Sequence, residues 1–166
     1  MSQAVIKWKK GVFDVTPLLK NGMRPDYSSA MGALFANDCL KVLPEIGDAV
    51  VDTIFADPPF NIGKQYRKNT NDRLPENEYI TWCKNWVKEC VRTLKPGGSI
   101  FVYNLPKWNI QIGAYLNQLG MEFRHWISIE ISACLPIPGR LHQATTACYT
   151  ILKGSPKHSI EFEHLS

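Results

Sequence analysis

Residues 50–60 of the chain read Val-Val-Asp-Thr-Ile-Phe-Ala-Asp-Pro-Pro-Phe. The first seven are mainly apolar and β-branched or aromatic, a composition that predicts a buried strand. Two consecutive prolines follow, and because proline lacks the N–H that a sheet needs, the strand must end there. Residues 57–60, which we call the DPPF loop, are therefore expected at the carboxyl end of this strand.

The sequence after the DPPF loop alternates between helix and strand patterns. A polar stretch over 61–76 predicts a loop, and apolar residues spaced three and four apart predict a helix from Tyr79 to Leu94. Lys95-Pro-Gly-Gly98 should end that helix, because proline cannot continue it and glycine adopts positive φ. The remaining segments are a strand over 99–103, a helix over 108–119, and strands over 123–132 and 144–152 separated by a turn region around Pro136, Pro138 and Gly139.

This order predicts an α/β sandwich whose sheet is parallel at first and antiparallel at its closing strands. Ligands of such sheets bind at the carboxyl ends of the strands, where the DPPF loop is expected. Upstream, the sequence shows a short apolar run over 33–36 and a helical turn over 39–43 that Pro44 should end. Residues 1–31 show little periodicity and are expected to form an N-terminal arm.

Composition sets wide bounds on class and partners. The chain has 166 residues, of which 45% are hydrophobic and 20% charged, so one folded domain is expected rather than disorder. Its net charge of +4 permits a polyanionic partner without requiring one. Five cysteines without a Cys-x-x-Cys pair predict reduced, buried thiols, with neither a disulfide framework nor a bound metal. No segment has the apolar length of a membrane span or a signal peptide, which predicts a cytoplasmic protein with no membrane partner.

The DPPF loop combines groups that suit a planar ring carrying an amino group. The Asp57 carboxylate offers only acceptors, and the Pro58 carbonyl is a second acceptor left free by the proline after it. Two converging acceptors match the two N–H donors of an exocyclic amine, and Phe60 offers a flat face for stacking. The loop therefore predicts a pocket for an aminated nucleobase.

Three segments of the chain carry a family resemblance: Asn37-Asp-Cys-Leu40, Phe55-Ala-Asp-Pro-Pro-Phe-Asn61 and Leu94-Lys-Pro-Gly-Gly-Ser-Ile-Phe-Val102. They resemble the S-adenosylmethionine-dependent amino-methyltransferases of DNA, which methylate N6 of adenine or N4 of cytosine. Their order is similar to that of the β group, in which the catalytic half precedes the cofactor-binding half. The resemblance implies a class I methyltransferase-like (Rossmann-like) sandwich, here incomplete. The Asp form of the motif is more typical of adenine enzymes.

The resemblance also implies roles for individual residues. A target adenine flipped out of DNA would bind with its amino group at Asp57 and the Pro58 carbonyl and its ring on Phe60. The implied catalytic residues are Asp57, Pro58, Pro59 and Phe60; the implied contacts to the cofactor S-adenosylmethionine are Asp38 and Asp57; the implied substrate contacts are Phe60, Asn61, Lys64, Arg67 and Lys68. For the three basic residues, contact with phosphates and a solvated charged loop are equally good interpretations.

The chain departs from the β-group pattern after its last strand. That group continues into a target-recognition segment and a Phe-x-Gly-x-Gly loop for the methionine part of the cofactor, and no such loop occurs in this sequence. We interpret residues 32–154 as the catalytic half of a methyltransferase, followed by a tail over 155–166. Either a second chain supplies the cofactor half, or the enzyme is truncated, or the protein is a non-catalytic nucleic-acid-binding remnant. Methylation of N4 of cytosine, or of RNA, is the alternative to N6 of adenine in DNA.

Overall fold

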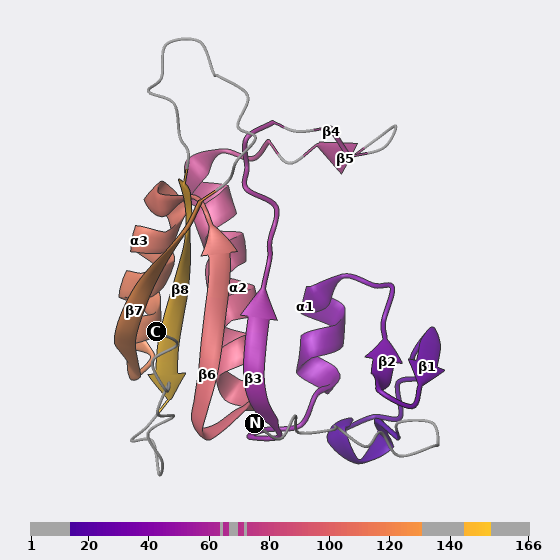
Figure 1. Ribbon diagram of the computed structural model, residues 1–166. Helices are drawn as coiled ribbons and strands as arrows, with labels where there is room; N and C mark the ends of the chain where they lie inside the picture. Colours follow the sequence, from indigo (N-terminus) through magenta and orange to yellow (C-terminus); the bar gives the residue numbers. More distant parts are fainter. Residues whose placement is uncertain (1–13, 64, 67–69, 72, 131–144, 154–166) are drawn as a thin grey trace, which may run out of the picture.

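The main sheet has four strands in the order β3, β6, β8, β7 (Figure 1). The computed structural model describes residues 14–63, 65–66, 70–71, 73–130 and 145–153. The four strands are β3 (Val51–Ala56), β6 (Leu94–Asn104), β7 (Met121–Glu130) and β8 (Thr145–Lys153). β3 and β6 run parallel, whereas β8 lies between β6 and β7 and is antiparallel to both. The expected α/β sheet, parallel first and antiparallel at its closing strands, is confirmed. The turn region expected around Pro136, Pro138 and Gly139 lies outside the described residues.

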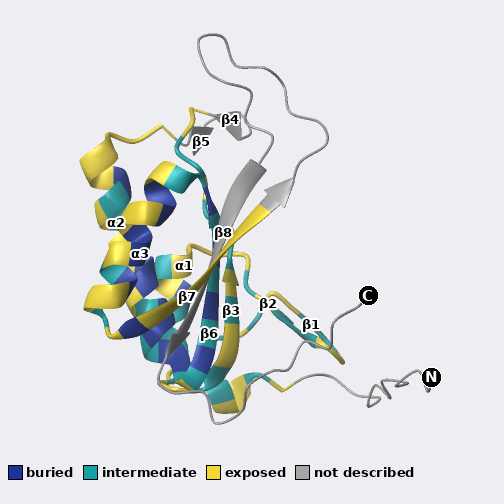
Figure 2. Cartoon of the chain, turned by 60° about the vertical axis from the view of Figure 1, so that its left-hand side comes forward, coloured by how far each residue is buried: buried dark blue, intermediate teal, exposed yellow. Residues whose placement is uncertain are grey.

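Helices α2 (Glu76–Thr93) and α3 (Pro106–Gln118) pack on one face of this sheet (Figures 1 and 2). The apolar face of each helix and alternate residues of β6 form the core, in which Val87, Ile100 and Leu116 have no exposed surface. Burying each such side chain contributes roughly 1.5–3 kcal/mol relative to leaving it in water. No helix in the described part of the chain combines the length and the apolar character needed to cross a membrane.

The opposite face of β3 is not covered by any described helix. Thr53 and Phe55 lie on this face, and Phe55 pairs in register with Phe101 of β6. Phe55 is 65% exposed, and within the described residues no strand pairs with the outer edge of β3. Parallel strands are normally buried on both faces. β3 therefore has the composition of an interior strand but lies at an edge.

Both ends of α2 differ from the prediction. The helix begins at Glu76, three residues before Tyr79. Its first turn is polar, with Pro75 before it and with Glu76 and Glu78, which favour a helix N-terminus. Lys95–Gly98 was predicted to be a helix-ending turn, but these residues form the first part of β6, where the register with β3 shifts between Val51 and Thr53. The helix does end before them, since Leu94 already has extended backbone angles.

Gly98 is required by the close approach of two backbone segments at this shift. A Cβ at this position would lie 2.9 Å from the carbonyl oxygen of Lys95 and 3.0 Å from that of Asp52. We expect Gly98→Ala to lower the free energy of unfolding by about 1–2 kcal/mol, because backbone atoms must move to admit the methyl group. The matched control is Gly32→Ala, where a Cβ would meet nothing within 4 Å. Urea unfolding should show a lower midpoint for the first variant only, and equal midpoints would contradict this explanation.

The N-terminal part contains short elements that the sequence did not predict. β1 (Tyr27–Ser29) and β2 (Gly32–Leu34) form a separate antiparallel hairpin. The hairpin therefore includes residues from the expected arm over 1–31 and residues that follow it. The expected helical turn is present as α1 (Cys39–Val42), continued by a 3-10 turn, η2 (Leu43–Glu45), that contains Pro44. A further 3-10 turn, η1 (Thr16–Leu18), precedes the hairpin. Within the polar stretch 61–76, β4 (Gln65–Tyr66) and β5 (Thr70–Asn71) pair with each other.

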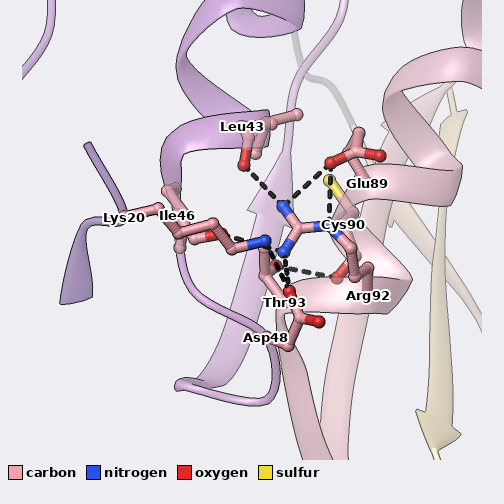
Figure 3. Close-up of polar contacts among 8 residues, drawn as sticks. All are labelled: Lys20, Leu43, Ile46, Asp48, Glu89, Cys90, Arg92 and Thr93. Atoms are coloured by element: carbon pink, nitrogen blue, oxygen red, sulfur yellow. Dashed lines mark hydrogen bonds and ion pairs between the residues drawn. The ribbon is translucent and has the colours of Figure 1, made fainter. Parts of the chain in front are cut away.

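Arg92, in the last turn of α2, fastens the segment between α1 and β3 to the helix (Figure 3). Its guanidinium donates to the carbonyl oxygens of Leu43 at 2.8 Å and Ile46 at 2.9 Å. It also pairs with the carboxylates of Asp48 and Glu89. Hydrogen bonds from Lys20 and Arg92 lower the pKa of the Asp48 carboxyl. The Arg92 side chain thus adds to the backbone hydrogen bonds from Ala49 and Val50 to the end of α2 in holding this connection.

The cysteines fall into two environments. Cys83 and Cys90 lie in the core, as predicted, and burial raises the pKa of Cys83 to about 11 and that of Cys90 to about 12. The prediction that all five are buried is wrong for Cys39, which is exposed at the start of the short helix α1. Cys134 lies outside the described residues, as does the side chain of Cys148.

Candidate functional site

The DPPF loop follows directly from the carboxyl end of β3, as predicted. Asp57 is exposed, and its carboxylate makes no hydrogen bond or ion pair with any side chain that the structure describes. Pro58 and Phe60 are half-buried and Pro59 is exposed. The loop therefore presents an open carboxylate next to an aromatic residue.

Two buried side chains donate hydrogen bonds to the backbone of the DPPF loop. The hydroxyl of Tyr79, in α2, donates to the carbonyl oxygen of Pro59 at 2.5 Å. The indole N–H of Trp108, in α3, donates to the carbonyl oxygen of Phe60 at 2.8 Å. Asn104, at the end of β6, donates from its amide to the Tyr79 hydroxyl at 2.9 Å. From the sequence, Tyr79 and Trp108 were assigned only to helices. The available signal is that each carries a polar group at a core position, and such a group needs a hydrogen-bond partner.

Aromatic contact completes the support of Phe60. Its ring lies 5.6 Å from that of Tyr103, centroid to centroid, with 55° between the ring planes. Tyr103 comes just before the end of β6, so the second strand of the parallel pair also contributes to the site. Asn104, the next residue, is fully buried, and its amide donates to the Tyr79 hydroxyl that supports the loop.

Asn61 lies next to the loop but has local partners. Its φ of +55° is in the left-handed region, which asparagine adopts more readily than most residues. Its side-chain oxygen accepts from the N–H of Leu74 at 2.6 Å, and its amide donates to the carbonyl of Leu74 at 2.9 Å. Asn61 therefore ties the end of the loop to the segment that enters α2, in addition to the contact with substrate that we expected for it.

Asp38 has a structural partner in the described chain. It is the N-cap of α1, and its carboxylate accepts from the backbone N–H of Leu40 at 3.0 Å. The strand before it, β2, belongs to the separate hairpin and not to the main sheet. The contact of Asp38 with the cofactor stays a prediction. Lys64, Arg67 and Lys68, the other expected substrate contacts, lie outside the described residues.

The described residues fit only the reacting end of an S-adenosylmethionine site. Asp57 is open at the carboxyl end of β3, where a methyl acceptor would meet the donor. The methionine part of the cofactor needs a protein backbone that can come close to it, and glycine is the residue that usually allows this. Among the described glycines, the space at Gly98 is filled by the backbone of Asp52, and Gly22, Gly32 and Gly120 have nothing within 4 Å. None of these glycines, nor Gly47 or Gly63, stands in a Phe-x-Gly-x-Gly stretch of the kind that the resemblance associates with the methionine part of the cofactor.

The fold is that of the class I methyltransferases. The structure matches PvuII DNA methyltransferase (cytosine-N4-specific) with a TM-score of 0.63 and 20% identity, over 78% of this chain and 52% of that chain. The M1.HpyAVI–SAM complex matches with a TM-score of 0.51 and 15% identity, over 74% of this chain and 54% of that chain.

Sequence comparison defines the family. Residues 51–164 match the DNA methylase family, so the chain belongs to this family of N6-adenine and N4-cytosine methyltransferases. Type II methyltransferase M.BamHI from Bacillus amyloliquefaciens is 38% identical over 143 residues, which are 86% of this chain and 34% of that protein. DNA adenine methyltransferase YhdJ from Escherichia coli is 33% identical over 52% of this chain and 29% of that protein. The chain spans about a third of the length of these two relatives.

Proposed function

We propose that this chain is the catalytic half of an S-adenosylmethionine-dependent DNA methyltransferase that methylates N6 of an adenine flipped out of the duplex. The observation that carries the proposal is the open Asp57 carboxylate beside Phe60 at the carboxyl end of β3. Family membership supports it, and DNA as substrate agrees with the expected cytoplasmic location. Asp57, the Pro58 carbonyl, Pro59 and Phe60 are the proposed catalytic residues, with Asn61, Lys64, Arg67 and Lys68 as further substrate contacts.

The chemistry required of these residues is activation of an amine. The lone pair of an aryl amine is delocalised into its ring, which makes the nitrogen a poor nucleophile. Hydrogen bonds from the amino group to Asp57 and the Pro58 carbonyl favour a more tetrahedral nitrogen. The negative field of the carboxylate also stabilises the positive charge that develops on this nitrogen. S-adenosylmethionine supplies the methyl group as an electrophile, and no covalent bond to the protein is needed.

Adenine is the proposed base because the motif carries Asp at position 57. Cytosine N4 is the second candidate, since the structural match includes a cytosine-N4-specific enzyme. The two are separated by digesting methylated DNA to nucleosides and identifying the product by mass spectrometry. N6-methyldeoxyadenosine supports the proposal, N4-methyldeoxycytidine replaces it with the second candidate, and modified ribonucleosides from an RNA substrate would contradict both.

Because no Phe-x-Gly-x-Gly loop occurs in this sequence, we propose a second polypeptide or chain segment that supplies the cofactor-binding half, with Asp38 at its border. The free edge and uncovered face of β3 are the proposed docking surface. Phe55 is 65% exposed there and lies beside Phe101, a pair that a covering helix would bury. A strand added along β3 would pair its free edge, and helices on the open face would give the parallel pair its usual two-sided cover.

The docking surface predicts the effect of a charge at position 55. Phe55→Asp is expected to weaken association at least about tenfold, because burying a Phe side chain contributes about 1.5–3 kcal/mol and an unpaired carboxylate opposes burial. The probe is the part of M.BamHI that this chain does not match, roughly two thirds of that protein. Ile110→Asp is the matched control, since Ile110 is 62% exposed but lies on α3. Equal affinity of the Phe55 variant and the wild type in titration calorimetry would remove β3 from the interface.

The activity itself is tested by transfer of a labelled methyl group to DNA. The full chain is assayed alone and with the unmatched part of M.BamHI, on unmethylated plasmid and genomic DNA. Transfer by the chain alone would show that it needs no second half, and transfer only in the mixture would support the proposed split enzyme. A remnant would transfer nothing in either arrangement and would not bind S-adenosylmethionine in the mixture, which would contradict the proposal.

A further inference from the structure

The hydrogen bonds that fix the DPPF loop come from outside it. Pro58 and Pro59 have no backbone N–H, so only Asp57 and Phe60 carry backbone donors within the loop. The donors to its last two carbonyl oxygens are instead the hydroxyl of Tyr79 and the indole N–H of Trp108. Proline rings fix φ but not ψ, so these two contacts fix the orientations of the peptide groups after Pro59 and Phe60.

The direction of the Tyr79 hydrogen bond follows from its neighbours. Asn104 is fully buried, and its side-chain oxygen already accepts from the N–H of Leu105 at 2.8 Å. Its amide therefore donates to the Tyr79 hydroxyl, which has a single proton to pass on. The hydroxyl donates that proton to the Pro59 carbonyl, at 2.5 Å. The main-chain oxygen of Asn104 accepts from the amide of Asn109 at 3.1 Å, which anchors the whole relay to α3.

Packing alone does not require these polar atoms. Tyr79 and Trp108 are 2% and 1% exposed, and their ring centroids lie 4.7 Å apart. Two phenylalanines would bury similar apolar surface at these positions without needing hydrogen-bond partners. The hydroxyl and the indole N–H have a specific use here, since each donates to a carbonyl oxygen of the loop.

We propose that Tyr79 and Trp108 are positioning residues for the methyl transfer, with Asn104 fixing the Tyr79 hydroxyl; this inference rests on the proposed function. By binding the carbonyls of Pro59 and Phe60, they turn those oxygens away from the target base. The acceptors left for the amino group are then the Asp57 carboxylate and the Pro58 carbonyl. The same two contacts hold the backbone of Phe60, and so fix its ring in the position where a base can stack on it.

The decisive variant is Tyr79→Phe, which removes one oxygen atom and keeps the ring. We expect the single-turnover rate of methyl transfer to fall about 10- to 100-fold, because a small displacement of reacting groups has effects of this size. The KM for S-adenosylmethionine should stay within about twofold, since the cofactor is held elsewhere. Tyr115→Phe is the matched control, because the hydroxyl of Tyr115 makes no hydrogen bond with any residue that the structure describes. Trp108→Phe should resemble Tyr79→Phe.

Hydrogen exchange separates this inference from the proposed function. Exchange in a peptide spanning residues 56–63 should be faster in Tyr79→Phe than in wild type and Tyr115→Phe, and this readout needs no activity. If wild type transfers no methyl group in either assay arrangement, the proposed function fails, whereas unchanged exchange in Tyr79→Phe defeats the positioning role itself. A transfer rate within twofold of wild type overturns the proposal. So does a loss of rate accompanied by an equal rise in KM, which indicates general structural damage.

Discussion

Asp57→Asn is expected to lower the rate of methyl transfer about a thousandfold, or ~4 kcal/mol in the activation free energy. The change keeps the size and shape of the side chain but removes its negative charge. An amide can also present its NH₂ group to the amino group of the base, where two donors would oppose each other. The field that stabilises positive charge on the attacking nitrogen is lost at the same time.

The fold should not respond to this substitution. Asp57 is exposed, and no side chain in the described ranges bonds to it, so the unfolding midpoint should equal that of wild type. Asp52→Asn is the matched control: Asp52 lies on β3, the strand that leads to the loop, is exposed, and pairs with Lys95 at 2.8 Å. Its transfer rate should stay within about twofold of wild type. If Asp57→Asn retains more than about a tenth of the wild-type rate, Asp57 is not the residue that activates the amine.

Arg92→Met should have the largest effect on stability among the predicted substitutions, lowering the free energy of unfolding by about 3 kcal/mol. Methionine keeps much of the apolar stem but cannot donate a hydrogen bond. The carbonyls of Leu43 and Ile46 then lose a charged donor, which is worth roughly 1.5–3 kcal/mol for each bond before non-additivity. For a chain of this length the loss corresponds to a fall of about 6–12 °C in Tm.

Two further variants test the explanation for Arg92. Arg92→Lys keeps the charge but not the planar fork that reaches several acceptors at once, so an intermediate stability is expected. Arg124→Met removes an arginine whose ion pair with Glu122 is exposed, and should change stability by less than about 0.5 kcal/mol. If Arg92→Met behaves like Arg124→Met in denaturant unfolding, the contacts in Figure 3 do not hold the connection to β3.

Much of the fold could be predicted because its elements have local signals. The apolar run over 50–56 and the prolines after it place β3 and its end within one residue of the structure. Glu76, by contrast, was missed as the start of α2, because apolar spacing carries no information about a polar first turn. The strand character of Lys95–Gly98 was also missed: it depends on the approach of Asp52, a contact that local sequence does not contain.

The candidate site shows the same division. Asp57 and Phe60 could be chosen from the sequence because a strand followed by Asp-Pro-Pro and an aromatic residue is a local pattern. Tyr79, Asn104 and Trp108 come from three different elements, and their spacing along the chain reveals nothing of their common target. Asn104 was the available clue, since an asparagine at an inward-facing strand position must find partners.

Among the described residues, the side-chain hydrogen bonds and the ring contact to the DPPF loop come from Tyr79, Trp108 and Tyr103, which all follow the loop in the chain. The described contacts that hold the loop therefore do not involve the chain that precedes β3. A gene rearrangement that moved a neighbouring coding segment from one terminus to the other would leave the shape of the loop intact. Evolution, or a protein engineer, could reorder such a chain at this point without rebuilding the contacts that support the loop.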